Sequence, residues 1–155
     1  MPVWRWKAFQ ELTLDELYAV LALRQEVFVV EQRSIYQDVD GLDPSALHLL
    51  GFGEEGSKPW LAAYLRILPP GVKYPGAASL GRVVASPRAR GRGLGRELTE
   101  KGIASLEERF PGVDIRISAQ DYLRGFYESL GFVAEGDVYD EDGIPHVEMV
   151  RVTRR

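Results

Sequence analysis

The sequence contains no cysteine and only two histidines, His48 and His146, in 155 residues. Without thiols the chain forms no disulfide bond and offers no thiolate nucleophile or cysteine ligand. A zinc site usually takes four cysteine, histidine or carboxylate ligands, and two histidines leave such a site poorly supplied. We therefore expect no metal ion and no covalent intermediate on sulfur.

Long hydrophobic runs are also missing from the chain. No stretch approaches the roughly 20 apolar residues that cross a membrane, and the first residues carry no signal-peptide pattern. We therefore expect a cytoplasmic protein without a membrane partner. The length predicts one domain over residues 1–155. The net charge of −4 disfavours a general nucleic-acid binder, since such proteins carry a basic surface.

The most informative segment covers residues 79–96, where an apolar run stops at Pro87 and a basic, glycine-rich loop leads into a helical pattern. The loop contains Arg88, Arg90, Gly91, Arg92, Gly93, Gly95 and Arg96. A strand, a glycine loop and a helix in this order present free backbone N–H groups to a phosphate, and arginine suits phosphate oxygens. The alternative is a glycine-rich turn with solvated arginines.

The spacing of the loop excludes two common phosphate motifs. No lysine and hydroxyl residue follow a second glycine as in a Walker loop, and Arg96 occupies the third glycine position of a dinucleotide fingerprint. A second glycine pattern, at residues 51–56, does match G-x-G-x-x-G. Because Glu54 and Glu55 would repel a pyrophosphate and a strand-like run follows, we interpret that segment as a hairpin turn.

Hydrophobic periodicity predicts the element order β-α-β-β-β-α-β-α-β-β, which is typical of an α/β fold with a mixed sheet. The first helix opens with a capping box, Thr13 to Glu16, and should run to Phe28, whereas Gly131 should end the last helix. The expected strands cover residues 3–9, 48–52, 60–67, 80–85, 114–119, 132–138 and 147–152, and the other helices cover 94–110 and 121–130.

Tyr127 is the second informative position. Leu123, Phe126 and Leu130 share its helix at core-like spacing, so one interpretation is a tyrosine that only packs beside them. The other interpretation uses its hydroxyl as a proton donor to a departing thiolate, because a phenol of ordinary pKa near 10 is adequate for that task.

Both segments resemble motifs of the GCN5-related N-acetyltransferases (GNAT). The run Arg90-x-x-Gly93-x-Gly95 is similar to the family's [QR]-x-x-G-x-[GA] loop, and Tyr127 with Gly131 and Phe132 is similar to its Y-x-x-x-G-F motif. Further stretches resemble the ElaA type of that superfamily; they lie at 27–32, 38–48, 81–84, 118–120 and 139–149. One departure is Ser34-Ile35, where members often have Cys-Pro.

The resemblance implies a mixed, mostly antiparallel sheet with a splayed strand pair and helices on both faces. It implies acetyl-CoA as co-substrate, with Gln120 on the pantetheine arm and Tyr127 facing the sulfur. Backbone groups of one strand would pair with the pantetheine: Val83, Val84 and Ala85. The loop that would hold the pyrophosphate comprises Arg90, Gly91, Arg92, Gly93, Leu94, Gly95 and Arg96. A primary amine would then attack the thioester directly.

The residue that deprotonates the amine is less determined by the sequence. Glu31 and His146 are the first candidates, because their segments would flank the cleft in the family fold; the other candidates are His48, Glu141, Asp142 and Glu148. An acidic rim would suit a cationic acceptor, either a small molecule or a peptide amine. A homodimer stays open, and so does a non-catalytic acyl-CoA sensor or interaction module on the same fold. A DNA-binding role for the arginine loop is disfavoured by the acidic remainder.

Overall fold

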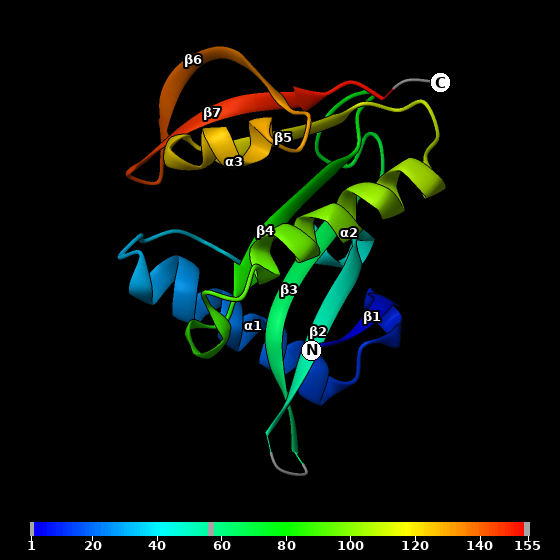
Figure 1. Ribbon diagram of the computed structural model, residues 1–155, viewed down its shortest axis with the longest axis vertical. Helices are drawn as coiled ribbons and strands as arrows, with labels where there is room; N and C mark the ends of the chain where they lie inside the picture. The colour runs from blue at the N-terminus through cyan, green and yellow to red at the C-terminus, as the bar shows by residue number, and fades with distance from the viewer. Residues whose placement is uncertain (1, 56–57, 154–155) are drawn as a thin grey trace.

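A computed structural model describes residues 2–55 and 58–153 of the chain, and Figure 1 shows the arrangement of its elements. The strands are β1 (Val3–Ala8), β2 (Leu47–Glu55), β3 (Lys58–Leu68), β4 (Ser79–Ala85), β5 (Ile115–Gln120), β6 (Val133–Glu141) and β7 (Ile144–Arg151). The helices are α1 (Leu14–Arg24), α2 (Leu94–Arg109) and α3 (Arg124–Glu128), with short 3₁₀ turns between several elements. This order confirms the alternation that the hydrophobic periodicity predicts.

The strands form two antiparallel groups, in the orders β1-β2-β3-β4 and β5-β7-β6. The groups meet at a single parallel bridge between Ala78 and Ile115, where the N–H of Arg116 donates to the carbonyl of Ala78 over 2.8 Å. Beyond this bridge β4 and β5 diverge, as the separation of the two halves in Figure 1 illustrates. The splayed pair expected from the family resemblance is therefore confirmed.

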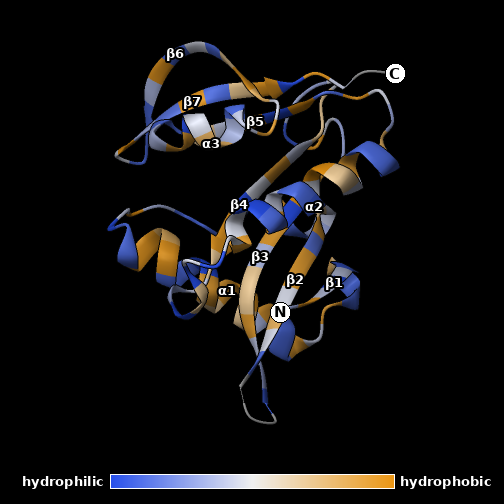
Figure 2. Ribbon diagram, in the orientation of Figure 1, coloured by the Kyte–Doolittle hydropathy of each residue, from blue (hydrophilic) through white to orange (hydrophobic). Residues whose placement is uncertain are grey.

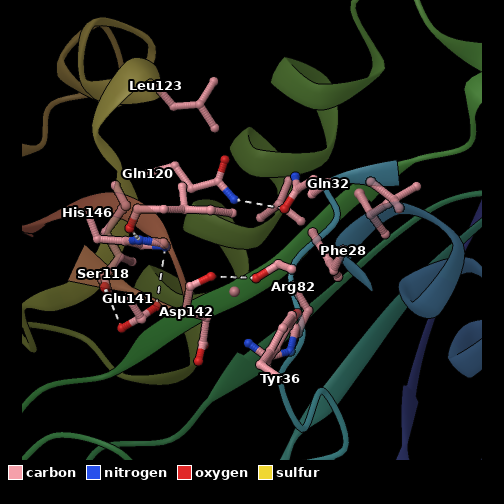
Figure 3. Close-up of a pocket in the computed structure, with 18 of the residues that line it drawn as sticks. Phe28, Gln32, Tyr36, Arg82, Ser118, Gln120, Leu123, Glu141, Asp142 and His146 are labelled. Atoms are coloured by element: carbon pink, nitrogen blue, oxygen red, sulfur yellow. Dashed lines mark hydrogen bonds and ion pairs between the residues drawn. The ribbon is translucent and has the colours of Figure 1, made fainter. Parts of the chain in front are cut away.

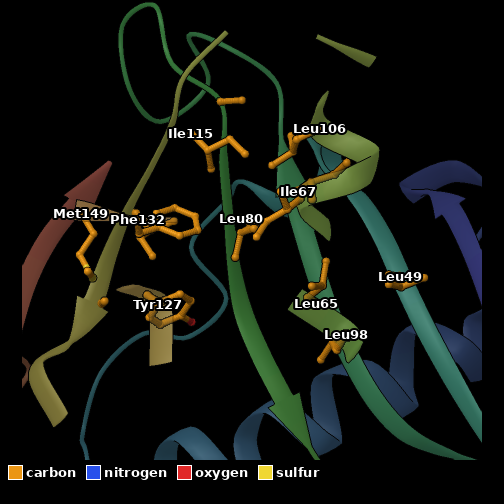
Figure 4. Close-up of a cluster of buried hydrophobic side chains, with 14 of the residues drawn as sticks. Leu49, Leu65, Ile67, Leu80, Leu98, Leu106, Ile115, Tyr127, Phe132 and Met149 are labelled. Carbon is orange, nitrogen blue, oxygen red and sulfur yellow. The ribbon is translucent and has the colours of Figure 1, made fainter. Parts of the chain in front are cut away.

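Helices α1 and α2 cover opposite faces of the first half. Along β3, Tyr64 packs in the cluster that contains Val20 and Leu23 of α1, whereas Leu65 packs in the cluster that contains Leu98 of α2. Figure 2 shows the hydrophobic course of β3 and the hydrophilic residues on α2. The larger cluster continues into the second half of the sheet through Tyr127, Phe132 and Met149 (Figure 4). One apolar core thus fixes both walls of the gap between β4 and β5.

The first helix begins as predicted but ends differently. The Thr13 hydroxyl accepts a hydrogen bond from the Glu16 N–H over 3.0 Å, and the Glu16 carboxylate accepts one from the Thr13 N–H, so the capping box is confirmed. The prediction that the helix stops at Phe28 is wrong, because residues Gln25–Glu31 continue it as a wider π-helical turn. A hydrogen bond from the Gln32 N–H to the Val27 carbonyl closes this turn at the edge of the cleft.

Several other boundaries also depart slightly from the expectations. Phe9 lies in a 3₁₀ turn and not in β1, and β6 extends to Glu141, further than the alternation of its residues suggests. The predicted hairpin turn at 51–56 begins too early, because β2 runs to Glu55, which pairs with Lys58 of β3; Gly56 lies outside the described residues. Gly131 adopts φ +94° after the last helix, as its predicted helix-ending role requires. No helix in the described part of the chain is long and apolar enough to cross a membrane.

Candidate functional site

A cleft of about 760 Å³ opens between β4 and β5. It is lined by the end of the first helix, the segment that follows it, β4, β5, the turn before α3 and the β6–β7 hairpin. The site residues expected from the sequence that line it are Glu31, Val83, Val84, Ala85, Arg90, Gln120, Tyr127 and His146. The remaining loop residues, 91–96, follow Arg90 into the start of α2.

The edge of β4 that faces the cleft has no strand partner among the described residues beyond the bridge at Ala78. Arg82 adopts φ +52°, and the pairing register with β3 shifts between Tyr64 and Arg66. These features describe a β-bulge, which places one extra residue in β4 and turns its backbone. The free edge from Arg82 to Ala85 can therefore pair with an extended ligand as a further strand would.

The glycine loop leads into a helix whose amino end is open. Gly91 and Gly93 adopt φ +81° and +72°, the left-handed region that glycine enters without steric cost. Gly93 is the N-cap of α2, and no side chain caps the helix there. A Cβ atom on Gly91, Gly93 or Gly95 would meet no other atom within 4 Å, so space surrounds the N–H groups of the first turn. This arrangement fits an anion with several oxygens.

Arg90, the first residue of the loop, forms a two-point ion pair with Glu31 at the end of the π-helical turn. The Nη1–Oε2 distance is 2.8 Å and the Nη2–Oε1 distance is 2.5 Å. The hydrogen bond from Arg90 lowers the pKa of Glu31, so the carboxylate stays charged at neutral pH. The pair joins the phosphate-loop side of the cleft to the first helix.

The segment from Glu31 to Ser34, here called the strap, crosses the cleft to the second half of the sheet. The side-chain amide of Gln120 donates to the side-chain oxygen of Gln32 over 3.2 Å. The Ser34 hydroxyl donates to the backbone carbonyl of Asp142 over 2.7 Å, which gives a role to the residue where family members often have cysteine. Figure 3 shows Gln32 and Gln120 pointing toward each other from opposite sides. The strap therefore connects the first helix to the second half of the sheet across the cleft.

Tyr127 is only 7% exposed, yet it lines the cleft. Its ring meets Phe126 and Phe132 edge to face, with centroids 5.1 and 5.6 Å apart. Burial raises the pKa of Tyr127 to about 12. Its hydroxyl makes no hydrogen bond to another described residue, so it is available to a ligand.

His146 lies on β7, on the side of the cleft formed by the β6–β7 hairpin. Its Nδ1–H donates to the carbonyl of Ile144 over 2.8 Å, which leaves Nε2 directed toward Oε2 of Glu141 at 3.3 Å. Glu141 also accepts a hydrogen bond from the Ser118 hydroxyl over 3.3 Å. Figure 3 shows Ser118, Glu141 and His146 as one cluster on the strands of the second half. The imidazole nitrogen and the carboxylate therefore lie together at the cleft, where both can contact a ligand.

The other acid–base candidates lie elsewhere. His48 is buried, accepts a hydrogen bond from the Tyr64 hydroxyl at Nδ1 over 2.6 Å and donates from Nε2 to the Asp43 carbonyl over 3.0 Å. Burial lowers the pKa of His48 and keeps it neutral. Glu148 binds Arg116 over 3.1 Å and does not line the cleft. Asp142 does line it, next to Glu141.

A buried ion-pair network, which the sequence analysis missed, supports the floor of the cleft. Arg24 binds Asp38 and Asp43 over 2.9 and 2.7 Å, and Arg66 binds Asp43 and Asp40 over 2.9 and 2.5 Å. Burial alone would lower the pKa of Arg24, but its hydrogen bond with Asp43 raises it. Charged residues within otherwise apolar segments are the sequence signal that could have indicated this network.

Arg82 connects this network to the cleft. Its Nε lies 2.8 Å from Asp38 and its Nη2 lies 3.2 Å from Asp40. Its guanidinium also lies over the ring of Tyr36, 5.7 Å from the centroid. The three contacts hold the bulged residue of β4 in its left-handed conformation, which costs of order 1 kcal/mol or more for a non-glycine residue. Within the described residues no group of His, Cys, Asp or Glu is placed to hold a metal ion.

Comparisons with known proteins agree with this geometry. The family model of an acetyltransferase (GNAT) domain matches residues 71–153. Protein ElaA of Escherichia coli is 39% identical over 150 residues, which cover 96% of this chain and 95% of that protein. The crystal structure of ElaA covers 97% of this chain and 99% of its own with a TM-score of 0.86.

A crystal structure of an acyl-CoA N-acyltransferase from Pseudomonas aeruginosa is also similar. It shares 45% sequence identity and a TM-score of 0.89, and the match covers 98% of this chain and all of that one. The likeness therefore extends over both halves of the sheet and the cleft between them. This chain belongs to the GNAT acetyltransferase family, among the homologues of ElaA.

Proposed function

We propose that the protein transfers an acetyl group from acetyl-CoA to a primary amine. The observation that carries this proposal is that the free edge of β4, Arg90 and Tyr127 line one cleft, with the uncapped amino end of α2 following Arg90 in the chain. An extended amide arm, a pyrophosphate and a leaving thiolate require these three kinds of partner. The family membership supports an acyl-CoA as the donor.

The donor would lie along β4. Backbone groups of Val83, Val84 and Ala85 would pair with the amides of the pantetheine arm, and Gln120 would bind the same arm after release from Gln32. The loop would hold the pyrophosphate through backbone N–H groups and the guanidinium groups of its arginines. This part of the loop comprises Arg90, Gly91, Arg92, Gly93, Leu94, Gly95 and Arg96. A backbone N–H near Val83 would polarise the thioester carbonyl.

Tyr127 would act at the leaving group. Because burial raises its pKa to about 12, the hydroxyl keeps its proton at neutral pH. It would donate a hydrogen bond to the sulfur as negative charge develops and deliver the proton as the carbon–sulfur bond breaks. The lack of another hydrogen-bond partner among the described residues leaves it free for this role.

Between the two candidate bases, His146 is better placed than Glu31. The ion pair with Arg90 lowers the pKa of Glu31 and makes that carboxylate a weak proton acceptor. His146 and Glu141 form a pair on the side of the cleft formed by the β6–β7 hairpin, and we expect the amine to approach there. We therefore assign proton removal to His146 assisted by Glu141, and regard Glu31 as the ion-pair partner of Arg90 in the absence of the donor.

The amine would displace the thiolate of coenzyme A directly. The neutral amine nitrogen forms a bond to the thioester carbon, the carbon–sulfur bond breaks, and the products are an amide and free coenzyme A. Because the chain contains no cysteine, the acetyl group would not pass through a covalent intermediate on a cysteine. A cytoplasmic location, a single domain and a homodimer stay predictions.

The test is the release of free thiol from acetyl-CoA over a panel of primary amines. Because the protein has no cysteine, its own side chains add no thiol signal. Amine-dependent release with a matching acetylated product supports the proposal. Binding of coenzyme A without release over the whole panel would favour the non-catalytic sensor instead.

A further inference from the structure

The amine end of the cleft carries charges of both signs. The charged residues lining it are Asp40, Lys73, Arg82, Glu141 and Asp142. The expected acidic rim therefore corresponds to Glu141 and Asp142 of the β6–β7 hairpin, whereas Lys73 and Arg82 add positive charge. The arrangement of these charges indicates which kind of amine fits.

Two of these charges are already compensated. Asp40 binds Arg66 over 2.5 Å and Arg82 over 3.2 Å, and Arg82 also binds Asp38 over 2.8 Å. With Arg24 and Asp43, this network holds three arginines and three aspartates in balance. Outside this network, the charged residues of the amine end are Lys73, Glu141 and Asp142, and none of them is paired with an arginine or lysine of the described residues.

Lys73 lies on the connection between β3 and β4, in the first half of the sheet. Its ammonium lies 5.5 Å from the centroid of the Tyr74 ring, and no carboxylate of a described residue forms an ion pair with it. Desolvation lowers the pKa of Lys73, and the charge of Glu141 acts in the opposite direction. Lys73 is exposed and lines the cleft, so its ammonium is accessible to a carboxylate ligand.

Glu141 lies on the second half of the sheet, at the end of β6. It faces Nε2 of His146 at 3.3 Å, and nearly half of its side chain is exposed. A primary ammonium that approaches this pair meets a negative charge and a group that can take a proton. The positive and negative groups therefore come from opposite halves of the split sheet.

The strap limits the size of the ligand between these groups. Besides the bond from Gln120 to Gln32, which we expect to open when the donor binds, the Ser34 hydroxyl connects the strap to the Asp142 carbonyl over 2.7 Å. In Figure 3 Asp142, whose backbone carbonyl accepts the bond from Ser34, lies between Glu141 and Arg82. A polypeptide acceptor that entered across the strap would have to open the Ser34–Asp142 bond, so this bond favours a small acceptor.

We propose that the acceptor is a small zwitterion, a free amino acid or a similar aminocarboxylate. Its amine lies at Glu141 and His146, and its carboxylate binds Lys73. This inference rests on the proposed acyl transfer to an amine and names the class of that amine. The atoms exchanged are those of the transfer already described, so no further reactant is required.

The test compares three amines of one chain length and similar basicity: 4-aminobutyrate, butylamine and 1,4-diaminobutane. We expect kcat/KM for 4-aminobutyrate to exceed that for butylamine by about tenfold, as expected for one charged hydrogen bond. Lys73→Met should remove this preference by raising KM for 4-aminobutyrate, and Lys73→Arg should retain most of it. Lys101→Met, on α2 and outside the cleft, is the matched control and should keep the wild-type ratio.

Preference for butylamine or diaminobutane would overturn the proposal, and so would an unchanged ratio in Lys73→Met. Equal turnover of a peptide amine with an amidated carboxyl end would overturn it as well. If no amine is acylated, the proposed function fails, but the subsite is still tested by thermal unfolding with coenzyme A present. In that case 4-aminobutyrate should raise the Tm of the wild type and not that of Lys73→Met, and the absence of this shift would overturn the subsite.

Discussion

Glu31 and Arg90 hold each other by two hydrogen bonds across the donor end of the cleft, at the position assigned to a pyrophosphate. A carboxylate beside a site for phosphate oxygens competes with them for the same guanidinium. The pair is also more than 40% exposed on both sides, so its own contribution to folding is small. Its main effect should therefore be on ligand binding.

The first prediction concerns this pair. Arg90→Ala should raise the Kd of coenzyme A about tenfold, because one charge-assisted contact to phosphate is lost. Glu31→Gln should lower the Kd a few-fold, because the guanidinium loses its competitor. Isothermal titration measures both changes, with Arg124→Ala as an arginine control outside the cleft. Weaker binding in Glu31→Gln would instead make Glu31 a support that Arg90 requires.

The second prediction concerns Tyr127. Tyr127→Phe should lower kcat by about a hundredfold, the usual contribution of a proton donor, and leave the Kd of coenzyme A nearly unchanged. The fold should survive because phenylalanine keeps the ring contacts with Phe126 and Phe132 and the hydroxyl has no partner among the described residues. Thiol release and thermal unfolding measure the two effects. Tyr122→Phe, on the adjacent turn, is the control, and a larger loss there would transfer the role to Tyr122.

The third prediction concerns the pH dependence of stability. Burial keeps the pKa of His48 below its ordinary value near 6.5, so the folded protein binds fewer protons than the unfolded chain as the pH falls below that value. The contribution of His48 to stability is complete above about pH 7 and decreases as the pH is lowered. Urea unfolding at pH 7.5 and 5.5 should show a larger loss of free energy in the wild type than in His48→Gln. Equal losses would show that His48 does not cause the effect.

The fourth prediction concerns the buried network. Arg24 has no exposed surface and binds Asp38 and Asp43, so Arg24→Met should leave these buried aspartates with one arginine each and the network with an excess negative charge. Breaking such a buried pair costs about 3–5 kcal/mol. Arg124→Met, which removes an exposed pair with Asp121, should cost less than about 1 kcal/mol. Urea unfolding of the two variants measures this difference, and equal losses would contradict the central role of the network.

Local signals in the sequence predict much of this fold. The capping box at Thr13 and the glycine at 131 mark helix ends because they depend on contacts within a few residues. The ion pair between Arg82 and Asp40 joins residues 42 positions apart, and no periodicity reports such a contact. The π-helical turn after Arg24 is equally invisible, since its residues also suit an ordinary helix.

The same distinction applies to the site. The glycine loop and Tyr127 lie in motifs of fixed spacing, so the sequence identifies them as candidates; in the structure Tyr127 and Arg90, the first residue of the loop, line one cleft. The strap, Lys73 and the pairing of Glu141 with His146 depend on how two halves of a sheet face each other. Sequence spacing contains no information on that distance.

The bridge at Ala78 and Ile115 has a mechanical consequence. Because this bridge is what joins the two halves of the sheet in the described part of the chain, it acts as the vertex of the cleft, and a small rotation there should change the width of the cleft. Ala78 is buried at this vertex, so a larger side chain would press on both halves at once. Binding of the donor or of the amine should then change the width of the cleft for the other substrate, although the two would contact different residues.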